Sequence, residues 1–239
     1  VDSVLIAKIL KDNNINFTCY VTGMKGKESP DVESAKKAAK EIGFTLKIAE
    51  ISFDGIESYI KKTGKIIGDF SLVKLGVGIT FYRALEEAKK DNIKIIYTGL
   101  GAEEIFAGYK RHVNARDINK ECKRGLEAIK ERDLDRDEAI AKHFNMQLKL
   151  PFLEKQLVGY ALKIPGELKV KKRNKKEYKK YILRQTAEKM GVPEEFAWRK
   201  KIAAQYGSKV DWAIERTAKA KGFKYKSDYI RRLFGKKIG

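Results

Sequence analysis

The sequence predicts an α/β fold in which a parallel sheet in the first half is followed by a helical carboxyl-terminal layer. Runs of β-branched and aromatic residues at 16–21, 44–51 and 93–97 alternate with apolar residues at helical spacing. After about residue 112 only the helical spacing continues. An alternating layout of this kind is typical of parallel sheets, which bind ligands at the carboxyl ends of their strands.

The clearest element boundaries lie around residues 29–43. Ser29 is expected to cap a helix, Pro30 fits the first helical position, and Gly43 is expected to end the helix. Residues 44–51 alternate between apolar and polar side chains, which predicts a strand. Residues 93–97 are mostly apolar, which predicts a short strand buried in the parallel sheet.

Further helices are expected on both sides of residue 112. In the first half they cover residues 56–62 and a stripe that contains Phe81, Leu85 and Ala88. In the second half we expect helices at residues 115–132, 135–144, 153–162, 177–190 and 210–218.

Composition excludes a disordered chain and a transmembrane helix. The 239 residues are 43% hydrophobic, and the longest stretch without Asp, Glu, Lys or Arg, residues 13–24, contains three asparagines. Cys19 and Cys122 lie far apart and lack metal or redox spacing, so a reducing, cytoplasmic location is expected. His112 and His143 have no partner at metal-ligand spacing, and we interpret both as structural or surface residues.

The charge balance admits two interpretations. There are 52 Lys and Arg against 32 Asp and Glu, which gives a formal net charge of +20. A charge of this size attracts polyanions, nucleic acid above all. The alternative is a protein from a hot environment, whose surface carries networks of ion pairs.

Two segments place polar groups where a phosphate could bind. Asp2 and Ser3 open the first expected helix, where they are either an ordinary cap or part of a phosphate site at the helix amino terminus. Gly99 and Gly101 follow the strand at 93–97, and Glu103 begins the next helix. The acidic turn either complements the helix dipole or holds the Mg²⁺ of a nucleotide that passes over the glycines.

A third segment combines an aromatic ring with cations. Trp198 is followed by Arg199, Lys200 and Lys201. Three consecutive cations are usually a solvated surface. A buried Trp198 would instead anchor a lysine beside a developing negative charge.

In order and spacing, these segments resemble the synthetase domain of asparagine synthetases and β-lactam synthetase, within the PP-loop ATP pyrophosphatase superfamily. Residues 1–3 match the end of the family's S-G-G-x-D-S loop, and residues 98–109 match S-G-E-G-[SA]-D-E-[IV]-F-G-G-Y. Residues 150–154 resemble V-P-F-L-D, residues 181–184 resemble K-Y-I-L-R, and residues 198–201 resemble W-R-x-K. Ser29 to Gly43 matches the helix after the second strand of the family.

The resemblance implies a single ATP-binding domain over residues 1–239, with an α/β nucleotide-binding part at 1–112 and a helical part at 113–239. Such domains use ATP and Mg²⁺ to convert a carboxylate, here most simply aspartate, into its adenylate, which an amine then attacks. By resemblance, Asp2 and Ser3 belong to the pyrophosphate loop, and Asp2 and Glu103 hold the metal. The resemblance also assigns Val21, Gly99 and Gly101 to ATP, and Lys201 to the phosphates and the transition state.

This sequence departs from the family where the acceptor substrate would bind. Leu100 replaces a glutamate, and Gln147 and Lys149 replace a glutamate and an arginine before residues 150–154, whereas Arg136 aligns with an arginine of the family. Leu100 and Gln147 cannot ionise, so they cannot accept a proton as a carboxylate does. The S-G-G of the loop is absent, and so is the amino-terminal glutaminase domain, so ammonia is expected from solution, a missing segment or a partner.

Two other functions stay open. Many PP-loop relatives adenylate a tRNA base, and residues 169–184 contain nine Lys or Arg and a single acid, with Tyr178 and Tyr181 interleaved. A solvated connector and helix explains the same segment, because Leu183 and Ala187 give the helix an apolar face. The loss of the acceptor carboxylates also fits a nucleotide-binding scaffold without ligase activity.

Overall fold

The computed structural model describes residues 1–173 and 176–235. The chain is a mixed α/β protein dominated by helices, and it divides into two compact units. Unit 1 comprises Val1–Asn16, Ile95–Arg132 and Leu148–Lys200, and unit 2 comprises Phe17–Lys94, Asp133–Gln147 and the chain from Lys201 onward. The division of the chain at residue 112 stays a prediction.

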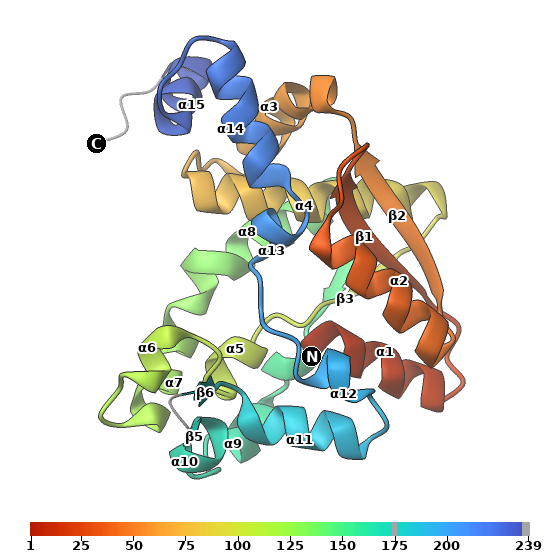
Figure 1. Cartoon of the computed structure of the whole chain (residues 1–239), viewed down its shortest axis with the longest axis vertical. Helices are drawn as coiled ribbons and strands as arrows, with labels where there is room; N and C mark the ends of the chain where they lie inside the picture. The colour runs from red at the N-terminus through yellow and green to blue at the C-terminus, as the bar shows by residue number, and fades with distance from the viewer. Residues whose placement is uncertain (174–175, 236–239) are drawn as a thin grey trace. The chain divides into compact units, whose positions relative to one another are not determined.

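Unit 2 is built around a two-stranded parallel sheet of β1 (Thr18–Met24) and β2 (Thr45–Ile51) (Figure 1). Helix α2 (Pro30–Ile42) connects the two strands. The other helical elements of this unit are the 3-10 turn η1 (Phe53–Gly55), α3 (Ile56–Ile67), α4 (Leu72–Lys90), α8 (Asp135–His143), α13 (Ala204–Gly207), α14 (Val210–Ala220) and α15 (Lys226–Phe234).

Helices α2 and α4 cover opposite faces of this sheet. The Thr22 hydroxyl donates a hydrogen bond to the Thr80 carbonyl of α4 at 2.7 Å. Gly23, the next residue of β1, lies so close to Val32 of α2 that an added Cβ would meet its Cγ2 at 2.6 Å. Successive strand residues face opposite sides, so β1 is enclosed between the two helices.

The predicted boundaries of α2 are confirmed. The helix begins at Pro30 after the extended Ser29, and it ends at Gly43, which has the left-handed φ of 78° that glycine tolerates without strain. The Ser29 side chain does not cap the helix, because its hydroxyl donates to the Ser208 carbonyl at 3.3 Å instead. The strand predicted over residues 44–51 is also confirmed, as β2.

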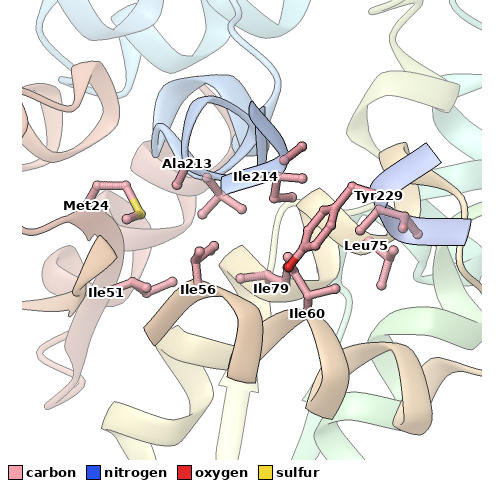
Figure 2. Close-up of a cluster of buried hydrophobic side chains, with 12 residues drawn as sticks. Met24, Ile51, Ile56, Ile60, Leu75, Ile79, Ala213, Ile214 and Tyr229 are labelled. Atoms are coloured by element: carbon pink, nitrogen blue, oxygen red, sulfur yellow. The ribbon is translucent and has the colours of Figure 1, made fainter. Parts of the chain in front are cut away.

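The core of unit 2 lies where α3, α4, α14 and α15 meet the ends of β1 and β2. Figure 2 shows Met24 and Ile51 from the strands beside Ala213 and Ile214 of α14. The whole cluster is apolar apart from the hydroxyl of Tyr229, which donates to Glu57 at 2.8 Å. Burial of its branched aliphatic side chains supplies the main stabilising free energy of this unit.

Unit 1 contains short elements, several of which are connected by tight turns. Its first two segments carry α1 (Asp2–Asp12), β3 (Ile95–Tyr97), α5 (Ala102–Ile105), α6 (Lys110–Val113) and α7 (Ile118–Glu127). A π-helical turn, η2 (Lys130–Leu134), leads out of the unit, and β4 (Gln147–Lys149) leads back into it. The third segment carries η3 (Pro151–Leu153), α9 (Lys155–Ala161), α10 (Gly166–Lys169), β5 (Lys171–Arg173), β6 (Lys176–Tyr178), α11 (Tyr181–Lys189) and α12 (Glu194–Ala197).

Two expectations about strands and one about a helix differ from the structure in extent or burial. Strands do not stop near residue 112, because β4 pairs with β3, and β5 pairs with β6 as an antiparallel hairpin. The strand predicted at 93–97 forms only over Ile95–Tyr97, and both of these end residues are 47% exposed rather than buried. The helix predicted at 177–190 begins at Tyr181, because residues 176–178 belong to the hairpin.

Of the other helices predicted in the second half, those at 115–132, 135–144 and 153–162 are present with shorter bounds, whereas the one at 210–218 extends to Ala220. The helix expected at 115–132 is limited to α7, because the Asp117 carboxylate accepts the Lys120 N–H at 3.0 Å and fixes the helix start.

No helix in the described part of the chain is both long and apolar enough to cross a membrane.

Candidate functional site

The predicted site residues Asp2 and Glu103 are brought together in unit 1. Asp2 is in the first turn of α1, and Glu103 is in the first turn of α5. The ammonium group of Lys180 donates to Asp2 Oδ2 at 2.6 Å and to Glu103 Oε1 at 2.8 Å. Both carboxylates therefore converge on a single point, which the Lys180 Nζ occupies.

Lys180 is held in an unusual environment for a lysine. Its residue is only 2% exposed, and its backbone has a left-handed φ of 54° directly before α11. Burial by itself would lower the pKa of Lys180, but the Asp2 and Glu103 carboxylates outweigh burial and raise the pKa above its ordinary value. The side chain therefore carries its positive charge between two anions.

The turn before Glu103 depends on two glycines. A Cβ at Gly99 would lie 2.7 Å from the Asp2 Cβ, and a Cβ at Gly101 would lie 2.5 Å from Leu153 Cδ2. Gly101 also has a φ of 96°, which side chains rarely adopt. The absence of side chains here lets the β3–α5 turn approach Asp2 closely, and this approach is what places Glu103 within reach of Lys180.

The two carboxylates of α5 have different partners. Glu104 is fully buried and forms an ion pair with Arg132. Burial raises the pKa of Glu104, against the opposing effect of Arg132. Gly125 of α7 lies against the Glu104 side chain, with an added Cβ only 3.4 Å from its Cγ. Glu104 therefore anchors α5 to the unit, while Glu103 faces Lys180.

Arg184 anchors the segment that follows the site. It is buried on α11 and donates to the carbonyls of Lys179, Ala197 and Arg199 at 2.8, 2.7 and 3.0 Å. Burial lowers the pKa of Arg184, although Asp2 and Glu103 act in the opposite direction. The guanidinium thereby ties α11 to the segment at residues 197–199, where Trp198 packs edge-on against Tyr178 and Tyr181.

Several other residues predicted from the sequence also lie in unit 1. Ser3 follows Asp2 in α1, and its backbone nitrogen is 3.5 Å from where a Gly99 Cβ would be. The Leu100 N–H donates to the Thr98 hydroxyl at 3.4 Å, and the Lys149 carbonyl accepts the Thr98 N–H at 3.2 Å. Leu100 and Lys149 are thus near the turn through their backbone atoms.

The remaining predicted residues lie in unit 2. Val21 is in β1, Gln147 is exposed at the start of β4, and Lys201 is exposed. Arg136 is buried on α8, where it pairs with Asp137 at 2.8 Å and with Asp133 at 3.0 Å. The roles assigned to these four residues stay predictions.

Sequence reasoning assigned no role to Lys180, although the structure gives it two contacts in the site. It directly precedes residues 181–184, which resemble the family block K-Y-I-L-R. This position within the family block is the feature of the sequence that could have identified Lys180 as a site residue. Within a run of lysines, however, nothing in the residue type distinguishes the one that is buried.

The chemistry of the site suits a cation bound together with phosphates. No group of three or more His, Cys, Asp or Glu side chains that could hold a metal occurs among the described residues. Asp2 and Glu103 provide two carboxylates aimed at one point, and Mg²⁺ is usually held by one or two carboxylates plus phosphate oxygens and water. Asp2 Oδ1 is buried without a hydrogen-bond partner in the part of the chain that the structure describes, so it has a free acceptor.

Comparison with known proteins decides the family. The family model described as asparagine synthase matches residues 1–121 and 113–221. The chain belongs to the asparagine synthase family. It is 32% identical to the putative asparagine synthetase [glutamine-hydrolyzing] 1 of Methanocaldococcus jannaschii over 260 aligned residues, which cover 95% of this chain and 47% of that protein. It is 27% identical to the chicken (Gallus gallus) asparagine synthetase [glutamine-hydrolyzing], over 86% of this chain and 38% of that protein.

The human asparagine synthetase [glutamine-hydrolyzing] is similar at a comparable level, with 26% identity over 86% of this chain and 38% of that protein. The chain thus spans about half the length, or less, of the relatives that it matches. The asparagine synthase match includes Asp2, Glu103 and Lys180, so the charged cluster lies within the family domain.

Replacing Gly108 by alanine should disrupt this cluster. An added Cβ would lie 1.5 Å from Glu103 Oε2 and 3.0 Å from the Glu103 Cα, so the carboxylate that contacts Lys180 through Oε1 must move. We expect the free energy of unfolding to fall by about 1–3 kcal/mol, because Lys180 loses part of its buried ion pair. Urea unfolding measures this change.

Gly159→Ala is the matched control, since no atom lies within 4 Å of its added Cβ in α9. This variant should be as stable as the wild type or more stable, because alanine favours a helix over glycine. Equal stabilities of the two variants would contradict the predicted clash.

Proposed function

We propose that this chain is the synthetase part of an ATP-dependent amide ligase that releases AMP and pyrophosphate. The observation that supports it is the convergence of Asp2, Glu103 and Lys180 in a domain of the asparagine synthase family. We further propose that the chain has the PP-loop type of fold, with the triphosphate over the β3–α5 turn. Aspartate is the proposed carboxylate, as the names of the relatives suggest.

In the proposed reaction, a carboxylate oxygen of the substrate attacks the α-phosphorus of ATP. The bond from that phosphorus to the bridging oxygen breaks, and pyrophosphate leaves with the electron pair. The nitrogen of an amine then attacks the acyl carbon of the adenylate, AMP departs, and the nitrogen loses a proton. Ammonia is the simplest amine, and its source is proposed to lie in another segment or partner.

The residues of unit 1 suit the first of these steps. Negative charge accumulates on the departing pyrophosphate, and cations beside it stabilise the transition state. Lys180 supplies one such cation, and Asp2 and Glu103 would hold Mg²⁺, which supplies further positive charge when bound. Ser3 at the amino-terminal turn of α1 is proposed to contact the pyrophosphate, because unpaired N–H groups and the helix dipole favour anions there.

The remaining assignments are part of the same proposal. Val21 and Gly99 are proposed to line the adenosine, and Lys201 is proposed to contact the phosphates. Leu100 and Gln147, which replace carboxylates of the family, are proposed to alter recognition of the acceptor substrate. Their side chains cannot carry charge, so the identity of the carboxylate substrate is the part of the proposal that experiment would most readily change.

Exchange of radiolabelled pyrophosphate into ATP tests the proposal. Exchange that requires Mg²⁺ and is stimulated by aspartate or another small carboxylate is the expected result. Exchange that requires bulk tRNA would replace this function by adenylation of an RNA base. Tight ATP binding without exchange under any of these conditions would leave a nucleotide-binding scaffold.

Glu103→Gln should reduce the exchange rate by about 100-fold, the usual cost of removing one charge-stabilising group from a reaction site. The substitution keeps the shape of the side chain but removes the negative charge that a metal requires. Glu127→Gln is the control, because Glu127 is exposed on α7 of the same unit. An equal exchange rate in Glu103→Gln and Glu127→Gln would contradict the metal role of Glu103.

The structure gives the RNA alternative little support. Lys171 and Lys172 of the β5–β6 hairpin are exposed, as phosphate contacts require. However, the rings of Tyr178, Tyr181 and Trp198 pack edge-on against one another, with centroids 5.4–6.4 Å apart. Rings engaged in this way offer less surface for stacking on a base.

A further inference from the structure

The Lys180 ammonium occupies the position that a metal ion would need. Its Nζ contacts Asp2 Oδ2 at 2.6 Å and Glu103 Oε1 at 2.8 Å, and these are the oxygens that converge in the site. Mg²⁺ binds carboxylate oxygens at about 2.0–2.1 Å. The ammonium lies where a metal ion bound to the same two oxygens would lie, so the two cations compete for this position.

Charge makes the two occupants mutually exclusive as well. Lys180 balances one of the two carboxylate charges, and Arg184 lies close enough to both carboxylates to affect them electrostatically. A free divalent cation entering this buried cluster would meet strong repulsion from Lys180. The phosphates of a nucleotide would remove that repulsion, because they give the ammonium other anions to contact.

Lys180 is also the member of the cluster that is able to move. The guanidinium of Arg184 is fixed by the carbonyls of Ala197 and Arg199 and by that of Lys179. Among the described residues, the ammonium of Lys180 has no backbone acceptor, and its hydrogen bonds are to the two carboxylates. A lysine side chain has four rotatable carbon–carbon bonds, so its ammonium can shift without movement of the backbone.

We propose that Lys180 is a resident cation that closes the metal position in the nucleotide-free protein, so that a divalent metal enters only together with the triphosphate. This inference rests on the proposed function, because it takes Asp2 and Glu103 as the metal ligands. It adds that the order of binding is set by Lys180. The free protein therefore discriminates against Mg²⁺, although it holds two carboxylates that converge on one position.

Binding of Mn²⁺, which replaces Mg²⁺ at oxygen ligands and is visible by electron paramagnetic resonance, tests the proposal. Wild-type protein should bind Mn²⁺ much more tightly with a non-hydrolysable ATP analogue than without it. Lys180→Met should bind Mn²⁺ without nucleotide at least about tenfold more tightly than the wild type does, since each tenfold corresponds to about 1.4 kcal/mol and a buried charge contributes more than this. Lys172→Met removes the same charge from an exposed position and should leave Mn²⁺ binding unchanged.

Lys180→Met leaves two carboxylates without their counter-ion, so its stability must be followed as well. Its melting temperature should rise on addition of Mg²⁺ alone, whereas the melting temperature of the wild type should not. Lys180→Gln, which keeps a hydrogen-bond donor, is measured in parallel. If neither variant folds, the wild-type titration decides: Mn²⁺ affinity that is equal with and without the nucleotide analogue would overturn the inference.

The result also separates this inference from the proposed function. If the wild type does not bind the ATP analogue, the proposed function fails, whatever the metal does. If the wild type binds the analogue with Mn²⁺ but Lys180→Met gains no affinity for Mn²⁺ alone, only the role of Lys180 as a resident cation fails.

Discussion

Replacing Arg136 by alanine should lower the free energy of unfolding by about 3–5 kcal/mol, the range measured when one partner of a buried ion pair is removed. Arg136 is buried on α8, and its guanidinium donates to Asp137 at 2.8 Å and to Asp133 at 3.0 Å. Asp137 is also buried, so the substitution leaves a carboxylate without compensation in the interior. Urea unfolding followed by tryptophan fluorescence measures the loss.

The loss should become smaller as the pH falls. Burial already raises the pKa of Asp137 against the opposing effect of Arg136, and removal of Arg136 would raise the pKa further. In the variant, folded Asp137 therefore binds a proton at a higher pH than unfolded Asp137 does, and protonation removes the uncompensated charge. Lys36→Ala, which breaks the exposed pair with Glu33, should change stability by less than about 1 kcal/mol. A loss in Arg136→Ala no larger than this would show that its ion pairs do not stabilise the fold.

This expectation affects how Arg136 is interpreted. The sequence places it on the acceptor-substrate side of the site, by resemblance to an arginine of the family. Its two partners in the structure give it a structural role in unit 2. A loss of pyrophosphate exchange in Arg136→Ala would therefore need to be compared with the loss of folded protein before it is assigned to substrate binding.

Replacing Lys201 by alanine should abolish exchange of pyrophosphate into ATP, with a loss of about 100-fold to 1,000-fold, while the melting temperature stays nearly unchanged. Lys201 is proposed to stabilise charge on the departing pyrophosphate. Its side chain is exposed, so little packing is lost in the variant. Exchange assays and thermal unfolding of the same preparation measure the two effects.

Lys200→Ala is the control for Lys201, because it removes the same charge from the neighbouring exposed residue. It should retain exchange activity within a few-fold of the wild type. Full activity in Lys201→Ala would refute the assignment, whereas equal losses in the two variants would indicate a general effect of positive charge.

The parts of the fold that were predicted well are those with local signals. Pro30 and Gly43 bound α2 through their own backbone preferences, and β2 follows from its alternation. The exposure of β3 could not be predicted, because an apolar run of three residues does not specify what covers it. The β5–β6 hairpin was missed because its strands consist mainly of lysine and arginine, which carry little strand preference.

The candidate site shows the same limit. Asp2 and Glu103 were paired through family resemblance, because 101 positions separate them in the sequence. The position of the Glu103 side chain depends on contacts between distant residues, such as the close approach of Gly99 to Asp2, and no local sequence pattern shows such contacts. Lys180 was missed because burial, rather than residue type, distinguishes it from Lys179 and Lys176.

Unit 1 is assembled from three separate stretches of chain, and each contributes one member of the charged cluster. Asp2 comes from the first stretch, Glu103 from the second and Lys180 from the third. No contiguous fragment that omits one of these stretches can carry the complete cluster. Its formation consequently requires contacts between residues as far apart in the sequence as Asp2 and Lys180, and a proteolytic cut that releases the amino-terminal stretch would remove Asp2 from the cluster.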